Sequence, residues 1–483
     1  MKVLFVTSEA YPLLKTGGLG DVAGALPQAM VAAGEDVRIL IPAYPQALDL
    51  VKDKRAPINL GDSLGVGDVN LIEARMPSGD VTVWLVDCPA MYDRVGNPYT
   101  QPDGTDWPDN HLRFALLSRI AARLSIPGNV MDWTADIVHA NDWQGGLTAA
   151  YLHFWGGEHA RTVFTVHNLQ YQGLFAPDIV PQVGLPETAY SSHGVEFHDQ
   201  VSFLKAGLHY SDAITTVSPT YAKEIMEPEL GCGLDGLLRH RASAVHGILN
   251  GIDEDVWNPN TDPHIPHAYS LTRRAGKAKN KADLQREMGL PIDDKAPLFC
   301  VVSRLTAQKG INLIAESAPA LRTLGIQLAI LGNGDRPLED LLSSLASTND
   351  GIATTIGYDD ALAHRLIAGA DVLLMPSRFE PCGLTQMYAM RYGTLPLVFK
   401  TGGLADTVVD CRDRANGTGF VFDEPSSTAL FETAERAISL YKNPKSWQKA
   451  QRNAMSQDLS WKHAAKVYID LYKDLMPSLT KKT

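Results

Sequence analysis

Two basic residues and one acidic residue stand near the ends of predicted strands in the second half of the sequence. Arg304 directly follows the apolar run Leu298–Ser303, Lys309 lies in the turn beyond it, and Glu380 lies after Val372–Met375. A planar guanidinium and a point-charge ammonium together suit a diphosphate on which negative charge is growing. A carboxylate at the same sheet edge can bond sugar hydroxyls or stabilise positive charge at an anomeric carbon. The alternative is that both cations are surface charges beside a turn.

The acidic residue belongs to a longer run, Met375–Thr385, which joins a strand end to a predicted helix. Cys382 lies in this run, and an isolated cysteine is more often a small buried apolar residue than a nucleophile. A second run, Lys400–Asp406, places two adjacent glycines where another helix begins. Backbone N–H groups at such a turn can approach an anion, so both runs are candidate phosphate contacts.

A third glycine-rich run, Lys15–Asp21, joins the first predicted strand, Lys2–Thr7, to a predicted helix, Val22–Ala33. Glycines at this place let backbone N–H groups reach a phosphate, and the helix dipole favours the anion. Lys15 would add a mobile cation. The run lacks both the dinucleotide spacing G-x-G-x-x-G and the phosphate loop G-K-[ST], so neither of those functions is supported. A plain glycine-rich turn is the alternative.

Polar residues follow two further strands of the first half, in the runs His139–Trp143 and Val166–Leu169. These runs lie at equivalent ends of strands that we expect to be neighbours, which favours a shared crevice. Single histidines and aspartates at strand ends also serve as structural groups.

The elements that must position these residues repeat one pattern along the chain. Short apolar, β-branched runs alternate with helical stretches punctuated by glycine, which predicts parallel strands with crossover helices. In the first half such runs are Lys2–Thr7, Val81–Val86, Asp136–His139, Thr162–Val166 and Ala213–Val217. In the second half they are Leu298–Ser303, Gln327–Leu331, Ile352–Ile356, Val372–Met375 and Leu395–Phe399. Because the pattern begins afresh, two doubly wound sheets are expected.

Length, composition and charge limit the classes of protein to which the chain can belong. The chain has 483 residues, 45% of them hydrophobic, and a formal net charge of −12, so affinity for nucleic acid or anionic lipid is not expected. The sequence contains no apolar run long enough to span a bilayer and no secretory signal, which predicts a cytoplasmic protein without a membrane partner. The five cysteines are scattered without a C-x-x-C pair, which argues against a disulfide framework and a zinc site.

Taken together and in this order, the runs around Lys15, Arg304 and Lys309, Glu380 and Thr401 resemble the bacterial glycogen synthases and plant starch synthases. The resemblance extends from Lys2 to about Trp461. It implies a GT-B fold, in which two Rossmann-like doubly wound domains face each other across a deep interdomain cleft. It also implies an enzyme that transfers glucose from ADP-glucose to the non-reducing end of an α-1,4-glucan, retains the α configuration and releases ADP.

The resemblance also assigns the site residue by residue. The catalytic set is Glu380, Lys309, Arg304 and His167. The donor and phosphate contacts are Lys15, Gly17, Gly18, Tyr358, Cys382, Gly383, Leu384, Thr385, Thr401, Gly402 and Gly403. The sugar and acceptor contacts are Asp21, Asp142, Asn168 and Asn250. Tyr358 matches a position that packs on the nucleotide base. One departure is Tyr388, because many retaining GT-B enzymes have a glutamate there that binds ribose.

The same resemblance predicts the domain limits and the partners. The limits are 1–245 for the acceptor-side domain, 246–257 for the linker, 258–457 for the donor-side domain and 458–483 for a helix that returns to the first domain. The partners are the nucleotide sugar and the glucan, with no metal ion, pyridoxal phosphate or other cofactor. A homo-oligomer is possible and is not specifically predicted.

Three other interpretations remain at this stage. A sucrose-type synthase or a sugar-nucleotide epimerase would share the fold but not the Lys-Thr-Gly-Gly-Leu run. A phosphorylase would need a longer chain and a pyridoxal phosphate lysine. A glucan-binding scaffold without activity would have little reason to keep Lys15, Arg304, Lys309 and Glu380 together. For an active enzyme, retention through a covalent intermediate and retention through same-face attack both stay open, and we favour same-face attack.

Overall fold

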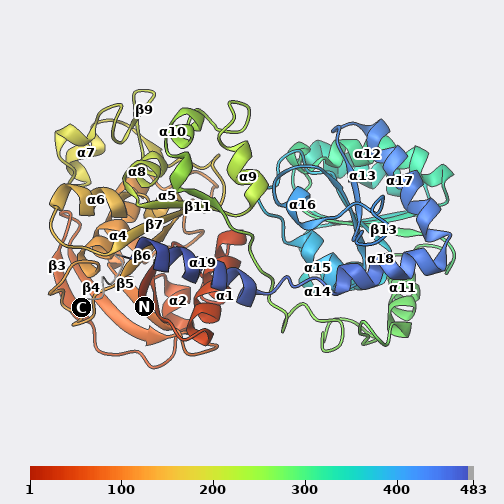
Figure 1. Ribbon diagram of the computed structural model, residues 1–483, viewed down its shortest axis with the longest axis horizontal. Helices are drawn as coiled ribbons and strands as arrows, with labels where there is room; N and C mark the ends of the chain where they lie inside the picture. Colours follow the sequence, from red (N-terminus) through yellow and green to blue (C-terminus); the bar gives the residue numbers. More distant parts are fainter. Residues whose placement is uncertain (477–483) are drawn as a thin grey trace, which may run out of the picture. The chain divides into compact units, whose positions relative to one another are not determined.

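The computed structural model describes residues 1–476, which form two compact α/β units (Figure 1). The first unit contains Met1–Gly251 together with the chain from Trp461 on, and the second contains Ile252–Ser460. The division after Gly251 falls inside the range 246–257 that the sequence analysis gave to the linker. The predicted fold class, two α/β units that each contain a parallel sheet, is confirmed.

The first unit is built on a nine-stranded sheet. In spatial order its strands are β12 (Val245–Gly247), β11 (Ala213–Thr216), β7 (Arg161–Val166), β6 (Ile137–Asn141), β1 (Lys2–Val6), β2 (Asp36–Pro42), β5 (Thr82–Asp87), β4 (Asp68–Arg75) and β3 (Ile58–Asp62). The strands from β12 to β5 run parallel, whereas β4 pairs antiparallel with both β5 and β3. The antiparallel strands β3 and β4 extend the parallel sheet at one edge, and the sequence pattern did not predict them. Strand β4 mixes buried residues with partly or fully exposed ones and β3 has only one buried residue, so neither is a continuous apolar run.

Helices and a small second sheet complete the first unit. The α-helices are α1 (Gly18–Ala32), α2 (Pro45–Leu50), α3 (Pro89–Tyr92), α4 (Asn110–Leu124), α5 (Asp142–Gly145), α6 (Leu147–Trp155), α7 (Ile179–Gln182), α8 (Phe203–Tyr210), α9 (Pro219–Glu224), α10 (Asp235–His240) and α19 (Trp461–Leu475). Short 3-10 helices cover Glu187–Ala189 and Ala242–Ala244. The small sheet contains β8 (Leu174–Phe175), β10 (Gln200–Ser202) and β9 (Glu196–Phe197).

Helix α1 begins four residues before the predicted start at Val22, directly after Gly17. Gly17 has extended backbone angles and is the N-cap, so Gly18 and Gly20 already lie in the first turn. The sequence pattern places these glycines in the turn before the helix. Glycine is unfavourable in a helix interior. The cost is smaller here, since the first turn of a helix leaves its N–H groups outside the helical hydrogen-bond pattern in any case.

Helix α19, the dark blue helix in Figure 1, packs beside α1 in the first unit. Its tyrosines Tyr468 and Tyr472 are buried, and the Tyr472 hydroxyl lies 2.6 Å from Nδ1 of His139 on β6. Residues near the two ends of the described chain therefore share one core. The predicted tail segment, 458–483, continues past residue 476, and its last part lies outside the described residues.

The second unit is built on a six-stranded sheet in which every strand pair is parallel. Its order is β15 (Ile352–Ile356), β14 (Gln327–Gly332), β13 (Leu298–Val302), β16 (Val372–Met375), β17 (Leu395–Phe399) and β18 (Phe420–Phe422). The helices are α11 (Ala275–Glu287), α12 (Ile311–Thr323), α13 (Arg336–Thr348), α14 (Asp360–Gly369), α15 (Thr385–Arg391), α16 (Gly402–Thr407), α17 (Ser427–Tyr441) and α18 (Pro444–Met455), with a 3-10 turn at Ala307–Lys309.

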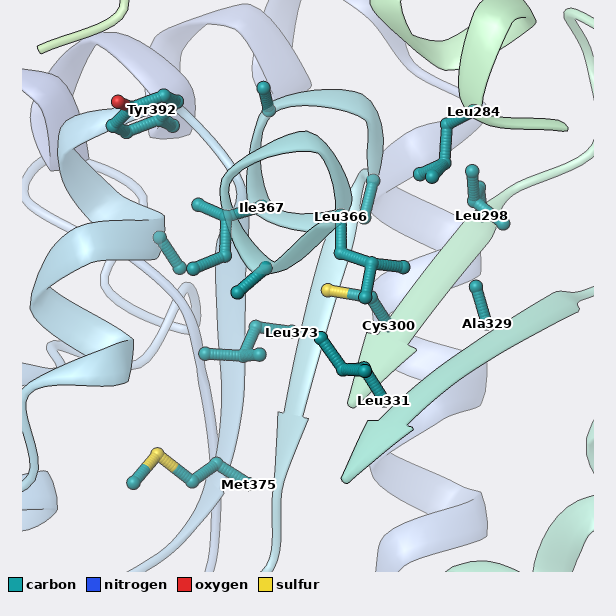
Figure 2. Packing of buried hydrophobic residues seen from close by; sticks show 14 of the residues in the cluster. Leu284, Leu298, Cys300, Ala329, Leu331, Leu366, Ile367, Leu373, Met375 and Tyr392 are labelled. Carbon is teal, nitrogen blue, oxygen red and sulfur yellow. The ribbon is translucent and has the colours of Figure 1, made fainter. Parts of the chain in front are cut away.

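The core of the second unit lies between this sheet and α14 (Figure 2). Leu366 of α14 lies over Cys300 of β13, and both side chains are fully buried. All five of the strands predicted for this unit are present. Strands covered on both faces have continuous apolar sequences, which is why the sequence could predict them. Within residues 1–476, none of the helices combines the length and the apolar character that crossing a lipid bilayer requires.

Candidate active site

In the first unit, the buried carboxylate of Glu9 organises the loop that follows β1. Its Oε2 accepts hydrogen bonds from the backbone N–H groups of Thr16 at 2.5 Å and Gly17 at 3.3 Å. Its Oε1 accepts from the Thr16 hydroxyl at 2.8 Å and the Tyr99 hydroxyl at 2.6 Å. Four neutral donors therefore hold one carboxylate directly before helix α1. The sequence analysis missed Glu9 and Tyr99, and only the position of Glu9 close to a strand end could have indicated a role.

This arrangement corrects part of the prediction for the glycine-rich run. The Gly17 N–H, expected to point at a phosphate, is directed at the carboxylate of Glu9. A Cβ atom added to Gly17 or Gly18 would still meet no atom within 4 Å, so the space in front of both residues is open to a ligand. Lys15 lies at its rim, with Nζ 2.7 Å from a carboxylate oxygen of Asp21.

His167 and Asp142, predicted from two different strand ends, lie together. The backbone N–H of His167 donates to Asp142 Oδ1 at 2.8 Å, and the ring Nε2 lies 3.0 Å from Oδ1 of Asn141. Because the Asn141 amide nitrogen donates to the carbonyl of Val6, its oxygen is the acceptor for His167. The neutral imidazole therefore carries its proton on Nε2, and its Nδ1 remains an acceptor.

Burial controls the charge of this pair. Burial lowers the pKa of the His167 imidazole to about 3, so the ring is neutral at physiological pH. Burial also raises the pKa of the Asp142 carboxyl to about 7, against the opposing effect of hydrogen bonds from the N–H groups of His167 and Asn168. Asp142 has a positive φ of 50°, a conformation that is uncommon for residues other than glycine and is tolerated by Asp and Asn. The first unit thus presents a weakly charged, hydrogen-bonding site.

Asn168 and Asn250 are placed differently from each other. The Asn168 side-chain oxygen accepts from the Gln170 N–H at 3.0 Å and so stabilises its own turn. Asn250 is buried at the end of the first unit, and its Oδ1 has no hydrogen-bond partner among residues 1–476. A buried acceptor without a partner is costly, which makes Asn250 a candidate contact for a ligand hydroxyl.

His139, from the same run as Asp142, is a core residue. Its two ring nitrogens lie 2.6 Å from the Tyr472 hydroxyl and 2.5 Å from the Thr165 hydroxyl. Burial, together with the charge of His167, lowers the pKa of His139 to about 3. Of the residues in this run, Asp142 therefore lies beside His167 in the candidate site, whereas His139 is part of the hydrophobic core.

In the second unit, Lys309 and Glu380 form a buried ion pair with Nζ 2.6 Å from Oε2. Their side chains are 16% and 9% exposed, so the pair is largely removed from water. Such a pair is strongly destabilised when one partner is removed, because the remaining charge is left unpaired. Lys309 can donate three hydrogen bonds, so the contact to Glu380 leaves donors for a ligand.

Tight packing between loops holds this pair in place. Gly310, with φ 69°, ends the turn that carries Lys309, and a Cβ atom there would collide with the carbonyl oxygen of Pro376. A Cβ atom on Gly402, with φ 42°, would collide with the carbonyl oxygen of Glu380. The loops after β13, β16 and β17 therefore interlock, and only glycine fits at these two contacts.

The same interlocking corrects the expectation for the Lys400–Asp406 run. The Gly403 N–H, proposed as a phosphate donor, donates to the carbonyl oxygens of Glu380 and Pro381, each at 3.1 Å. Thr401 is buried, and its carbonyl accepts from the N–H groups of Leu404 and Ala405. This turn thus supports the loop of Glu380 through its backbone.

The remaining predicted residues of the second unit fall into two groups. Arg304 and Tyr358 are exposed, Tyr358 to 82%. The Arg304 carbonyl accepts from the Ser303 hydroxyl and the Thr306 N–H, each at 3.1 Å, whereas its guanidinium has no hydrogen-bond or ion-pair partner among residues 1–476 and is available to a ligand. The others form the turn into α15: Cys382 is buried and forms no disulfide, and Gly383, Leu384 and Thr385 are partly exposed.

The sequence patterns did not identify two hydroxyl residues in the turns that carry Lys309 and Glu380. Ser377, which is 1% exposed, and Thr306 each have a buried hydroxyl oxygen without a hydrogen-bond partner in residues 1–476. Both lie in the turns that carry Arg304, Lys309 and Glu380. The signal was available in principle, because hydroxyl residues in such turns are candidate contacts for phosphate or sugar oxygens.

Comparison with known families assigns both halves of the chain. Residues 2–240 match the model of the starch synthase catalytic domain, and residues 286–454 match that of glycosyl transferases group 1.

Curated relatives match over nearly the whole length. The chain is 51% identical to a glycogen synthase of Paramagnetospirillum magneticum over 98% of both chains. It is also 51% identical to a glycogen synthase of Rhodospirillum rubrum over 99% of both.

Solved structures give the same picture. The catalytic domain of starch synthase IV from Arabidopsis thaliana, bound to ADP and acarbose, matches with a TM-score of 0.86 and 31% identity over 98% of this chain and 99% of that one. A sucrose-phosphate synthase from Thermosynechococcus elongatus matches with a TM-score of 0.59 at 18% identity over 98% of both chains, which is a likeness of fold alone.

Proposed function

The chain belongs to the glycogen and starch synthase family of glycosyltransferases, and on that premise we propose that it extends an α-1,4-glucan with glucose taken from ADP-glucose. The non-reducing end of the glucan is the acceptor, the α configuration is retained, and ADP is released. Fold likeness alone would not assign an activity. The assignment therefore rests on the family and on the chemistry of the charged groups in the second unit.

The observation that carries the proposal is the buried Lys309–Glu380 pair in the turns that also hold Arg304. The donor already contains a good leaving group, so the protein must stabilise the charge that grows on the departing diphosphate. Lys309, which its ion pair with Glu380 holds in place, can do this with little reorganisation during the reaction, and the exposed guanidinium of Arg304 adds a second positive charge. Glu380 keeps the Lys309 ammonium in place and offers its second oxygen to a sugar hydroxyl.

The other predicted donor contacts follow from the same geometry. We assign the turn Cys382–Thr385 and the turn around Thr401 and Gly402 to the donor, with Gly403 supporting them through its backbone. Tyr358, exposed at the end of β15, contacts the nucleotide base. On the first unit, we assign anion binding to Lys15 and to the open space at Gly17 and Gly18.

For the glucose and the glucan, we assign the neutral groups of the first unit. A sugar offers hydroxyl groups, and His167 Nδ1, the Asn250 oxygen and the Asp142 carboxyl can bind them without a large desolvation cost. Asp21, paired with Lys15, and Asn168 are supporting contacts. The domain roles follow: acceptor on the first unit and donor on the second.

We propose that the α configuration is retained because the glucan hydroxyl attacks the anomeric carbon from the same face from which the diphosphate departs. A covalent intermediate needs a carboxylate nucleophile beside the anomeric carbon. We assign the neutral imidazole of His167, and no carboxylate, to the position beneath the sugar. Departure of ADP would then leave a phosphate oxygen as the base for the incoming hydroxyl.

We further propose that transfer needs neither a metal ion nor another cofactor, because Arg304 and Lys309 supply the positive charge. None of the five cysteines forms a disulfide among residues 1–476, which fits the reducing cytoplasm as the place of action. A homo-oligomer is compatible with this assignment and is not required by it.

One assay tests the activity, the donor and the metal requirement together. The purified protein is incubated with glycogen and either radiolabelled ADP-glucose or radiolabelled UDP-glucose, with and without EDTA. We expect label to enter glycogen from ADP-glucose at a rate that the chelator does not change. Incorporation only from UDP-glucose would overturn the donor assignment, and loss of activity in EDTA would overturn the role given to the two cations.

A further inference from the structure

A cluster of metal-ligating side chains lies in the second unit, separate from the Lys309–Glu380 pair. Ligand atoms of His264, Asp360 and His364 all lie within 4.8 Å of one another. Asp360 is the first residue of α14 and His364 lies one turn later, so both project from the same face of that helix. His264 lies in the irregular segment that precedes α11, and its ring centroid is 4.9 Å from that of His364.

The imidazole of His364 is oriented in the way that a metal ligand requires. Its Nδ1 lies 2.8 Å from Oδ2 of Asp262, a carboxylate whose side chain is fully buried. Asp262 also accepts from the Tyr392 hydroxyl at 2.6 Å and from the backbone N–H of His264 at 2.8 Å. A histidine that gives its Nδ1 proton to a buried carboxylate keeps the Nε2 lone pair for a metal, and the contact fixes the orientation of the ring.

Ring stacking fixes the plane of the His364 imidazole. Trp257 stacks on it with centroids 3.7 Å apart and planes 9° from parallel, and Tyr388 stacks on Trp257 at 3.9 Å and 7°. Tyr388 is the residue that replaces a ribose-binding glutamate in related enzymes. Here its ring supports a histidine, and a ligand whose orientation is fixed in advance binds a metal with little loss of entropy.

We propose that His264, Asp360 and His364 form a binding site for a divalent transition-metal ion of the Zn²⁺ type. Two imidazoles and one carboxylate suit Zn²⁺, with water in the fourth position, whereas Ca²⁺ and Mg²⁺ prefer sets of oxygen ligands. Tetrahedral ligands stand roughly 3.3 Å apart at normal Zn–N and Zn–O lengths. His264 and Asp360 are exposed, so their side chains can rotate to close this gap.

The bound ion would clamp the segment around His264 to the start of α14. It would supply no group to the departing diphosphate, because no ligand belongs to the turns of Arg304, Lys309 or Glu380. Its link to the predicted donor contacts is the Tyr358 hydroxyl, 3.5 Å from Asp360 Oδ1. The absence of cysteine pairs had argued against zinc at the level of sequence. That criterion does not cover a site in which Asp262 and the stacked rings of Trp257 and Tyr388 fix a histidine from another part of the chain.

The test uses the full-length protein after dialysis against EDTA and removal of the chelator. Co²⁺ is titrated as a spectroscopic probe, and Zn²⁺ affinity is measured by competition with a chromogenic chelator. We expect one equivalent of Co²⁺ to give the visible absorption of a nitrogen- and oxygen-ligated four- or five-coordinate ion, and Zn²⁺ to displace it. Circular dichroism confirms that each variant is folded.

Variants identify the ligands. His264→Ala and Asp360→Asn change exposed side chains and should each weaken Zn²⁺ binding at least about tenfold. His240→Ala removes an exposed imidazole in the first unit and should leave the affinity unchanged. The proposal is overturned if no Co²⁺ spectrum develops, if the two ligand variants bind Zn²⁺ as tightly as the parent protein, or if His240→Ala weakens binding as much as they do.

Discussion

Both units place a buried glutamate in a turn beyond a parallel strand, and they satisfy it in opposite ways. Glu9, after β1, accepts hydrogen bonds from two backbone N–H groups and two hydroxyls. Glu380, after β16, forms an ion pair with Lys309. The carboxylate in the first unit is held by neutral donors, whereas that in the second is held by a full positive charge.

The difference shows how one scaffold serves two chemistries. Around Glu9 the polar groups carry little charge, since His167 is neutral and Asp142 is partly protonated near neutral pH. Such groups can bind sugar hydroxyls without losing a strongly hydrated charge. Around Glu380 the cations remain, and these suit a diphosphate. Four substitutions can break or sharpen this contrast, and they are given from the largest expected effect to the smallest.

Lys309→Ala should give the largest effect, because it removes a cation from the leaving group and leaves Glu380 without its partner. We expect kcat to fall about 10²- to 10³-fold, corresponding to the roughly 2.7–4 kcal/mol measured for single charge-stabilising donors in other enzymes. Glycogen affinity should change little. Steady-state kinetics with ADP-glucose measure both, and Lys279→Ala, an exposed lysine of α11, is the matched control. An unchanged kcat with weakened glycogen binding would remove Lys309 from the leaving-group role.

Glu380→Gln should have a smaller effect on the same step. The amide oxygen can still accept from Lys309, so the fold should be preserved, but the negative charge is lost. We expect kcat to fall about 10- to 100-fold, which is about 1.4–2.7 kcal/mol. Kinetics report the change, circular dichroism reports the fold, and Glu432→Gln is an exposed control in the same unit. Near-normal turnover would mean that Glu380 acts only as a hydrogen-bond acceptor.

Asp142→Asn tests the weak charge of the first unit through pH. The folded-state pKa of Asp142, about 7, lies above its ordinary value of 3.8. The protonated form therefore stabilises the fold fully below about pH 4, and this contribution is lost as the pH rises towards 7. Asparagine keeps an oxygen for the His167 N–H and tolerates the positive φ.

Relative to the parent protein, the free energy of unfolding of Asp142→Asn should therefore rise with pH. The slope should reach at most about 1.4 kcal/mol per pH unit between about pH 4 and 7. Urea unfolding at several pH values measures it, with Asp80→Asn as an exposed control. A stability difference that is independent of pH would contradict the raised pKa.

Glu9→Gln should give the smallest effect, confined to the loop before α1. The amide oxygen can still accept from the N–H groups of Thr16 and Gly17, while the new NH₂ group faces hydroxyls that can rotate to accept from it. Only the charge assistance is lost, which is worth about 1 kcal/mol. Hydrogen exchange at the Thr16 and Gly17 amides should therefore accelerate about fivefold, whereas the exposed control Glu158→Gln should not change it. Unchanged exchange would mean that Glu9 does not hold this loop.

The sequence by itself determined the repeated strand–helix pattern and the positions of the polar turns. Strands such as β1 and β13 are covered on both faces, so their apolar runs identify them locally. Parallel strands bring their carboxyl ends to one edge, which is why residues as distant as Lys309 and Glu380 could be predicted on the same edge. The antiparallel strands β3 and β4 were not predicted, because partly exposed strands have no continuous apolar run.

The tertiary structure alone decided which groups are partners. Gly17 and Gly403 looked equally available as phosphate donors, yet their N–H groups are directed at Glu9 and at the Glu380 carbonyl. His139 became a core contact of Tyr472, although it stands in the same run as Asp142. A hydrogen bond depends on tenths of an ångström between segments far apart in the chain, and residue types along one segment do not contain that distance. The same reason hid the cluster of His264, Asp360 and His364, which exists only because folding brings an irregular segment to the start of α14.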